Sequence, residues 1–261
     1  MVMHPGTLLA QWDGLEVRLG FAPQLIDEQP YVHALDLQKT ILPLLNGPSG
    51  KNLREPVVID AGHGGEDAGA RGSFNGCKEK DLTLDWALRL RRSLAEKGVN
   101  ALLTRSKDAS LTLPDRVAVA VAAHAGMFIS LHFNSAAPSR NEAGLETYCL
   151  TPAGMPSSLT RSDAEEIAQA YPNNSFDAQN LQLAVQLHRA LLQVNGHQDR
   201  GIRRARFPAV LRGQQCPAVL IEGGYLSSPA EARQIADPAY RQRLADALAR
   251  VLATWIGKGA P

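Results

Sequence analysis

The chain has 261 residues, of which 44% are hydrophobic and 20% are charged, a composition typical of a globular protein with one sizeable core. Its 27 basic and 26 acidic residues give a formal net charge of +1, which argues against binding to nucleic acid. No apolar run approaches the ~18 residues of a membrane span, and the N-terminus lacks the features of an export leader.

The first part of the chain differs in pattern from the rest. Residues 1–46 contain short alternating segments, such as residues 15–21 and 30–37, which predict a small β-rich extension. Residues 47–55 are rich in turn-forming types and predict a linker.

From Pro56 onward, apolar runs alternate with helical periodicity, which predicts an α/β domain. The predicted strands are 57–61, 100–105, 127–133, 145–150 and 217–222. The predicted helices cover about 81–97, 114–125, 178–195 and 238–256. Between them, residues 151–178 form a long polar excursion of the kind that is usually functional or mobile, with a short helix predicted at 162–171.

The glycine-rich loop after the first of these strands invites a phosphate-binding interpretation, which fails. Gly62 and Gly64 fit the start of the dinucleotide-binding pattern, but the third glycine position is Asp67. Gly69 comes two residues too late, and the lysine of a nucleotide-binding loop is missing. A carboxylate facing a pyrophosphate is repulsive, so this function is excluded.

Polar residues follow three of the buried strands. His63 comes after residues 57–61, and His132 and Glu222 end two later strands. Ligands of open α/β sheets bind at the C-terminal ends of strands. A fourth polar residue, Glu79, comes just before the first long helix and close to His63 in the sequence. Two imidazoles and a carboxylate form a catalytic zinc site, and a further carboxylate completes a hydrolytic centre.

Each of these residues also has a purely structural interpretation. His63 alone fits a turn, and His132 alone fits a satisfied histidine of the core. Glu79 fits the first turn of a helix, where its charge meets the dipole favourably. Glu222 directly follows an apolar run, so its carboxylate requires a partner or a function. The four together favour the metal site.

Four segments, in this order, resemble the zinc-dependent N-acetylmuramoyl-L-alanine amidases of bacterial cell walls: VVIDAGHGGEDAGARG, KEKDLTLDWALRL, FISLHFNSA and PAVLIEGGYLSSPAEA. The resemblance covers about residues 56–256 and implies a catalytic domain over 56–258. It implies a twisted, mainly parallel sheet with helices on both faces. It also implies Zn²⁺ ligation by His63, Glu79 and His132, with Glu222 as the catalytic glutamate.

The same resemblance implies the reaction. The enzyme is expected to hydrolyse the amide between the lactyl group of N-acetylmuramic acid and L-alanine in peptidoglycan. Action in the cell envelope, periplasmic or extracellular, is expected, with the export leader absent from this chain. Residues 1–46 are expected to belong to a wall-associated module, and a regulatory protein partner is left unidentified.

Several residues near the ligands have two interpretations. Asp60 either orients the second ring nitrogen of His63 or is tied into the strand–loop junction. Asn134 either contacts substrate or makes a local turn. Gly64 and Gly65 are expected to let the backbone pass close to metal and substrate.

The excursion at 151–178 either lines the substrate groove or carries an inhibitory segment, with Glu165 or Glu166 reaching the metal. Two rival functions stay open. A zinc peptidase or another amidohydrolase would keep the metal site and change the substrate. A catalytically silent peptidoglycan-binding module would need no intact site.

Overall fold

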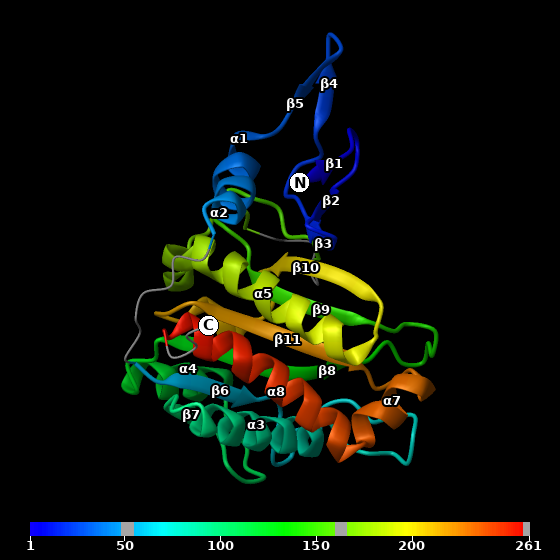
Figure 1. Ribbon diagram of the computed structural model, residues 1–261, viewed down its shortest axis with the longest axis vertical. Helices are drawn as coiled ribbons and strands as arrows, with labels where there is room; N and C mark the ends of the chain where they lie inside the picture. Colours follow the sequence, from blue (N-terminus) through cyan, green and yellow to red (C-terminus); the bar gives the residue numbers. More distant parts are fainter. Residues whose placement is uncertain (48–54, 160–165, 258–261) are drawn as a thin grey trace.

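The structure is a computed structural model that describes residues 1–47, 55–159 and 166–257. A nine-stranded sheet forms its centre, in the order β1-β2-β3-β10-β9-β11-β8-β6-β7, and β4 and β5 form a separate hairpin (Figure 1). The strands are β1 (Val2–Met3), β2 (Leu9–Trp12), β3 (Leu15–Arg18), β4 (Gln24–Ile26), β5 (Gln29–Tyr31), β6 (Val57–Ala61), β7 (Ala101–Leu103), β8 (Met127–Asn134), β9 (Leu145–Leu150), β10 (Asp199–Ala205) and β11 (Ala218–Tyr225).

The helices are α1 (Ala34–Asp36), α2 (Leu42–Leu45), α3 (Glu79–Glu96), α4 (Leu113–Ala122), α5 (Asp177–Asn195), α6 (Ala209–Arg212), α7 (Pro229–Ala236) and α8 (Pro238–Trp255). A π-helical segment (Leu37–Ile41) joins α1 to α2, and a 3₁₀ turn (Pro172–Phe176) leads into α5. No helix in the described ranges is long and apolar enough to cross a membrane.

The prediction of a mainly parallel α/β sheet is confirmed. The pairs β3/β10, β10/β9, β11/β8, β8/β6 and β6/β7 are parallel, whereas β9/β11, β1/β2 and β2/β3 are antiparallel. Parallel neighbours present their C-terminal ends at one edge, so the loops after β6, β8 and β11 lie close together.

Alternation along the central strands separates two apolar layers. In β6, Val57 and Ile59 belong to a large cluster that includes side chains of α3, α5 and α8. Val58 points the other way, into a smaller cluster with residues of α4 and α6. The sheet is therefore covered by helices on both faces, and Figure 1 shows α3, α5 and α8 across its front. His132 of β8 lies on the face of Val58.

The N-terminal extension continues the same sheet. Val17 of β3 pairs with Ile202 of β10 in parallel register, and Val17 is buried in the large cluster. The β4–β5 hairpin projects away from the sheet (Figure 1). Residues 48–54, most of the predicted linker, lie outside the described residues.

Strand β10, helices α1, α2, α6 and α7, and the π-helical and 3₁₀ segments were not predicted from the sequence. The segment at 30–37 was expected to belong to a β-rich extension, but its strand ends at Tyr31 and Ala34–Asp36 is helical. Of the helix predicted at 162–171, residues 162–165 lie outside the described residues, and residues 166–171 contain a turn and no helix. That prediction is wrong for the described part, since Glu166 to Ala170 are exposed and have no face to bury.

Candidate metal centre

The loop after β6 has an unusual backbone. His63 adopts a φ of 61°, a left-handed conformation that non-glycine residues rarely occupy. Gly64, Gly65 and Gly69 also have positive φ. This run of residues with positive φ turns the chain sharply, so that the imidazole of His63 faces Glu79 at the start of α3.

Two buried arginines hold this loop in place. Arg105 donates from Nε to the carbonyl oxygen of Ala61 and from Nη2 to that of Gly62, each at 2.9 Å. Arg116, on α4, donates to the carbonyl oxygens of Ala61 and His63, each at 2.7 Å. Backbone carbonyls without partners are costly to bury, and these guanidinium groups satisfy three in succession. The position of His63 is therefore fixed from outside the loop.

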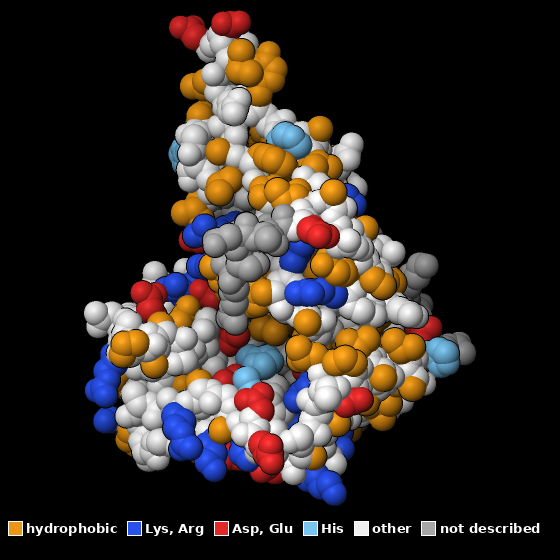
Figure 2. Space-filling view, turned by 180° about the vertical axis from the view of Figure 1, so that it is seen from behind, with side chains coloured by type: hydrophobic (Ala, Val, Ile, Leu, Met, Phe, Trp, Pro, Cys, Tyr) orange, Lys and Arg blue, Asp and Glu red, His pale blue; other side chains and the backbone are white. Residues whose placement is uncertain are grey.

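His63, Glu79 and His132 converge on one point. Nε2 of His63 lies 3.1 Å and Nδ1 of His132 lies 3.0 Å from Oε1 of Glu79. Their ligand atoms all lie within 4.8 Å of one another. The two rings meet edge to face, with centroids 4.9 Å apart. Figure 2, which views the molecule from behind, shows histidine and acidic side chains gathered in a hollow of the surface. The donor set is that of a catalytic zinc site.

Glu79 is held as a buried carboxylate. It is the first residue of α3, where the helix dipole favours negative charge, and it is 4% exposed. Its oxygens also accept hydrogen bonds from the backbone N–H groups of Ala70 (2.9 Å) and Phe133 (3.1 Å). Burial raises the pKa of Glu79, but hydrogen bonds and charge interactions with His132 and His63 outweigh this effect. The pKa of Glu79 therefore lies well below its usual range. The group is ionised at neutral pH, as a metal ligand must be.

Asp67 orients the imidazole of His63. Its Oδ2 lies 2.8 Å from Nδ1 of His63, on the ring edge away from Glu79. Burial lowers the pKa of His63, but Glu79 and Asp67 together raise it above its ordinary value. A carboxylate on Nδ1 keeps the proton there and leaves the lone pair of Nε2 for a metal.

The prediction that Asp60 orients His63 is wrong. Asp60 is 1% exposed and its carboxylate accepts hydrogen bonds from Arg116 (2.7 Å), Thr104 (2.7 Å) and Ser130 (2.8 Å). These partners tie Asp60 into the strand–loop junction, which was the alternative interpretation. Asp60 acts on the loop through Arg116, which also holds the carbonyl oxygen of His63.

The glycines of the loop have different neighbours. A Cβ at Gly62 would collide with the imidazole of His132, and one at Gly69 would lie 2.6 Å from Oε2 of Glu79. By contrast, Gly64 and Gly65 face residues 108–110, and the N–H of Gly65 donates to Asp108 at 2.7 Å. The nearest neighbours of Gly64 and Gly65 therefore belong to residues 105–110. Close packing against that segment explains why these positions are glycines, and no contact with substrate is needed to explain it.

Glu222 lies one strand away from the ligands. Its Cα is paired with that of His132 on β8 and with that of Glu146 on β9. Residues paired in this way point to the same face of a sheet, so the half-buried Glu222 lies on the face of His132. The sheet thus places a carboxylate beside His132, one of the three candidate ligands.

Sequence reasoning missed the role of Glu146, which is 2% exposed. Oε1 accepts from Arg200 Nε (2.8 Å) and the hydroxyl of Tyr225 (3.0 Å), and Oε2 accepts from the hydroxyl of Tyr148 (2.7 Å) and the amide of Asn134 (3.1 Å). Burial raises the pKa of Glu146, but these partners outweigh it, so the pKa falls below its ordinary value. A carboxylate within an apolar strand was the signal that could have found it.

Two further predictions concern less well-defined contacts. Asn134 donates to Glu146 and accepts from the N–H of Ser135 (2.8 Å), so both ends of its amide are engaged in the protein. In the excursion at 151–178, Glu165 lies outside the described residues and Glu166 is exposed. The carbonyl oxygen of Ile167 accepts from Arg206 Nη2 at 3.0 Å, which attaches the second half of the excursion to the body.

Comparison with known sequences gives a consistent result. Residues 57–254 match the N-acetylmuramoyl-L-alanine amidase family. The chain is similar to the amidase AmiC of Escherichia coli O6:H1, 30% identical over 250 residues, covering 86% of this chain and 59% of AmiC. It is also 31% identical to the amidase LytC of Bacillus subtilis over 79% of this chain and 37% of LytC. It therefore spans only part of the length of these two relatives.

Solved structures show the same similarity. The catalytic domain of the amidase CwlV from Bacillus (Paenibacillus) polymyxa var. colistinus superposes with a TM-score of 0.62 and 32% identity, covering 78% of this chain and 99% of that one. The amidase AmiC2 of Nostoc punctiforme gives a TM-score of 0.64 and 31% identity, covering 80% and 99%. In each case the match covers nearly the whole of the solved chain.

Proposed function

Because the chain belongs to the N-acetylmuramoyl-L-alanine amidase family, we propose that it hydrolyses the amide bond between the lactyl group of N-acetylmuramic acid and L-alanine in peptidoglycan. The observation that carries this proposal is the convergence of His63, Glu79 and His132, whose ligand atoms lie within 4.8 Å of one another. Glu222, paired with His132 across the sheet, supplies the additional carboxylate.

Zn²⁺ is the ion that suits these residues best. Two imidazoles and one carboxylate leave a position open, as in catalytic zinc sites, and the nitrogen ligands favour zinc over magnesium or calcium. The depressed pKa of Glu79 and the proton held on Nδ1 of His63 by Asp67 prepare both groups for a cation. When bound, the ion supplies Lewis-acid activation of water and of the amide carbonyl.

Residues of the protein have separate roles in the rest of the reaction. Glu222 accepts the proton of the attacking water and returns it to the departing amino group of L-alanine, so it serves as general base and then as general acid. Arg105 and Arg116 keep His63 in place while the substrate binds. Arg200 and the tyrosine hydroxyls fix the neighbouring Glu146, so that this second carboxylate stays ionised and its oxygens are bound within the protein.

The envelope is the expected place of action, because peptidoglycan lies there. A zinc peptidase with the same centre would cut within the stem peptide, whereas an amidase exposes the amino group of L-alanine. A silent wall-binding module would bind peptidoglycan and release nothing.

Product analysis tests the proposal. Purified peptidoglycan is incubated with the zinc-loaded protein, new amino termini are labelled, and the labelled residues are identified by mass spectrometry. We expect L-alanine as the labelled residue, together with glycan strands that carry free lactyl carboxyl groups. Labelled residues from within the stem, or no new amino termini at all, would contradict the proposal.

A further inference from the structure

Arg203, on β10, lies on the same face of the sheet as the candidate metal centre. Its Cα is paired with that of Tyr148 on β9, and Tyr148 shares a face with Glu146, two residues before it in the same strand. Glu146 is paired in turn with Glu222, and Glu222 with His132. Polar side chains therefore follow one another along this face, on the successive strands β8, β11, β9 and β10.

Two arginines share one buried carboxylate on this face. Glu146 is 2% exposed, and its Oε1 lies 2.8 Å from Nε of Arg200 and 3.3 Å from Nη2 of Arg203. Neutral donors, two tyrosine hydroxyls and the amide of Asn134, bind the same carboxylate. A buried carboxylate requires one opposite charge, so the cluster of Glu146 and the two arginines has one positive charge in excess.

Two other carboxylates lie near this cluster. Glu142 accepts a hydrogen bond from Nη1 of Arg200 at 2.8 Å, but its side chain is 44% exposed, so water screens its charge. Glu222 lies one strand nearer to the ligands, where the proposed zinc ion adds positive charge. Glu146 is the one described carboxylate that forms an ion pair with Arg203, whereas Arg200 has two such partners. The charge of Arg203 is therefore less fully neutralised than that of Arg200.

Arg203 presents one edge of its guanidinium group to solvent. Nε donates to the carbonyl oxygen of Arg200 at 3.1 Å, which fixes the plane of the group. In the part of the chain that the structure describes, Nη1 has no acceptor, and it is not one of the fully buried side-chain nitrogens that lack a partner. Nη1 is therefore accessible, although the side chain as a whole is 12% exposed. A guanidinium group held in this way receives a carboxylate through charged hydrogen bonds.

The position of Arg203 fits one part of the proposed substrate. Neighbouring strands lie ~4.8 Å apart, so Glu146, two strands from β8, and the arginine tip that meets it lie roughly 10 Å from His132. An extended peptide advances up to ~3.6 Å per residue, so a carboxylate on the residue after L-alanine lies roughly 7 Å beyond the scissile amide. That carboxylate therefore reaches Arg203 while the amide lies at the metal centre.

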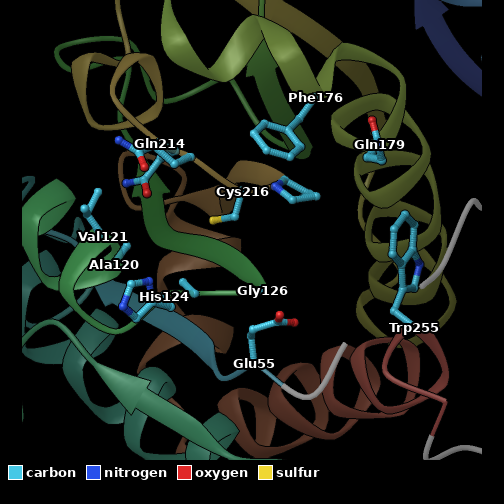
Figure 3. Close-up of a pocket in the computed structure, with 13 residues that line it drawn as sticks. Glu55, Ala120, Val121, His124, Gly126, Phe176, Gln179, Gln214, Cys216 and Trp255 are labelled. Carbon is cyan, nitrogen blue, oxygen red and sulfur yellow. The ribbon is translucent and has the colours of Figure 1, made fainter. Parts of the chain in front are cut away.

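The cavity shown in Figure 3 offers no comparable group. It has a volume of about 440 Å³, and its wall includes Gly126, just before β8, whereas His132 lies toward the other end of that strand. At ~3.3 Å per residue, the cavity is roughly 20 Å from the metal centre. No lysine or arginine occurs among its described lining residues, and its exposed ionisable side chains, His124 and Glu55, have opposite charges when ionised. A carboxylate of a substrate at the metal centre is therefore not bound there.

We propose that Arg203 binds a carboxylate of the stem peptide, on the residue that follows L-alanine, through the accessible edge at Nη1. The inference rests on the proposed function, which supplies the substrate and places its amide at the metal centre. The glycan of peptidoglycan is neutral, so the stem provides the anionic groups of the intact substrate. Arg203 then makes the enzyme selective for stems in which this group is a free carboxylate over stems in which it is an amide.

The test compares two disaccharide tetrapeptides that differ in one group. The residue after L-alanine is D-glutamate in one and D-isoglutamine in the other, so a carboxylate is exchanged for a carboxamide of the same shape. Cleavage by the full-length, zinc-loaded protein is followed by release of the stem peptide. We expect kcat/KM to be at least tenfold higher for the carboxylate, as is typical of a charged hydrogen bond. Equal kcat/KM values for the two substrates would overturn the proposal.

Variants of Arg203 separate a contact with substrate from a structural role. We expect Arg203→Gln to lower kcat/KM for the carboxylate at least tenfold and to change kcat/KM for the carboxamide less than twofold. We expect Arg203→Lys to retain part of the preference, because it keeps the charge and loses the planar pair of donors. Arg250→Gln, at an exposed arginine of α8, is the matched control and leaves both values unchanged. Equal losses on both substrates in folded Arg203→Gln would show a structural role and refute the proposal.

Binding of the peptides alone separates this proposal from the proposed function. The affinities of L-alanyl-D-glutamate and L-alanyl-D-isoglutamine for the zinc-loaded protein are measured by calorimetric titration, and release of L-alanine amino termini from peptidoglycan is measured in parallel. Release without discrimination between the two peptides would refute the role of Arg203 and leave the proposed function intact. Discrimination that Arg203→Gln abolishes, without release, would support the role of Arg203 and contradict the proposed function.

Discussion

Replacing Asp67 with asparagine isolates the contribution of a charge to zinc binding. The variant keeps an oxygen acceptor near Nδ1 of His63, where Oδ2 of Asp67 now lies at 2.8 Å, but removes its negative charge. Carboxylate partners of metal-binding histidines typically contribute 10- to 100-fold to metal affinity. The Asp67 side chain is 67% exposed, so water screens its charge and the lower end of that range applies. We expect zinc affinity to fall about tenfold, or about 1.4 kcal/mol.

The assay is competition for Zn²⁺ with a chromophoric chelator, at a pH well above the ordinary pKa of histidine, so that proton competition at His63 is small. Glu66→Gln is the matched control, because Glu66 is an exposed neighbour whose replacement removes the same charge. We expect the control to bind zinc as the original protein does. An unchanged affinity in Asp67→Asn, or equal losses in both variants, would refute the assignment of Asp67 as the partner that orients His63.

Two other perturbations address the loop and the second carboxylate. In Gly62→Ala the new Cβ falls 2.5 Å from Nε2 of His132, so we expect the imidazole to be displaced, zinc affinity to fall more than tenfold in the same competition assay, and the free energy of unfolding to drop by about 1–3 kcal/mol. In Glu146→Gln we expect a loss of about 2 kcal/mol at neutral pH, because charged hydrogen bonds to Arg200 and two tyrosines are weakened. The folded-state pKa of Glu146 is lowered from 4.5, so its stabilisation is fully present above that pH and is lost as the pH falls through the lowered value. Urea unfolding of both proteins as a function of pH should show the difference shrinking in acid, and a constant difference would contradict the ionised state of Glu146.

Local pattern and general topology were enough to propose the four main residues of the candidate centre. His63, His132 and Glu222 each end or follow an apolar run, and parallel strands present such ends at one edge. Glu79 precedes a helix and gives a weaker signal by itself, and it was proposed because it lies close to His63 in the sequence. The resemblance then implied that His63, Glu79 and His132 are the ligands. The fold class followed from the alternation of apolar runs and helical periods.

The partner of His63 could not be chosen from spacing. Asp60 and Asp67 lie close to it on either side, and only the left-handed backbone at His63 decides which carboxylate its ring meets. The buried Arg116 then takes Asp60, a contact between residues far apart in the chain. Neither the left-handed conformation of His63 nor the contact between Asp60 and Arg116 could be predicted from the local sequence.

Long-range pairing also explains the missed strand β10. Its sequence, DRGIRRA, is charged and contains a glycine, so it does not read as a buried strand. Arg200 meets Glu146 and Arg204 donates to Thr40 of the N-terminal segment, so its charges find partners from other elements. The same strand binds β3 and joins the N-terminal extension to the sheet, which no property of residues 1–46 alone predicts.

We expect the zinc-binding centre and Glu222 to perform the hydrolysis together, in separate roles. The most direct test compares the protein with Glu222→Gln, measuring zinc content and the release of L-alanine amino termini from peptidoglycan under the same conditions. Loss of a general base typically costs 10²- to 10⁴-fold in rate, so we expect the variant to hold about one zinc per chain and to lose activity by roughly that factor. Full activity in the variant, or no zinc bound by the original protein, would contradict the account.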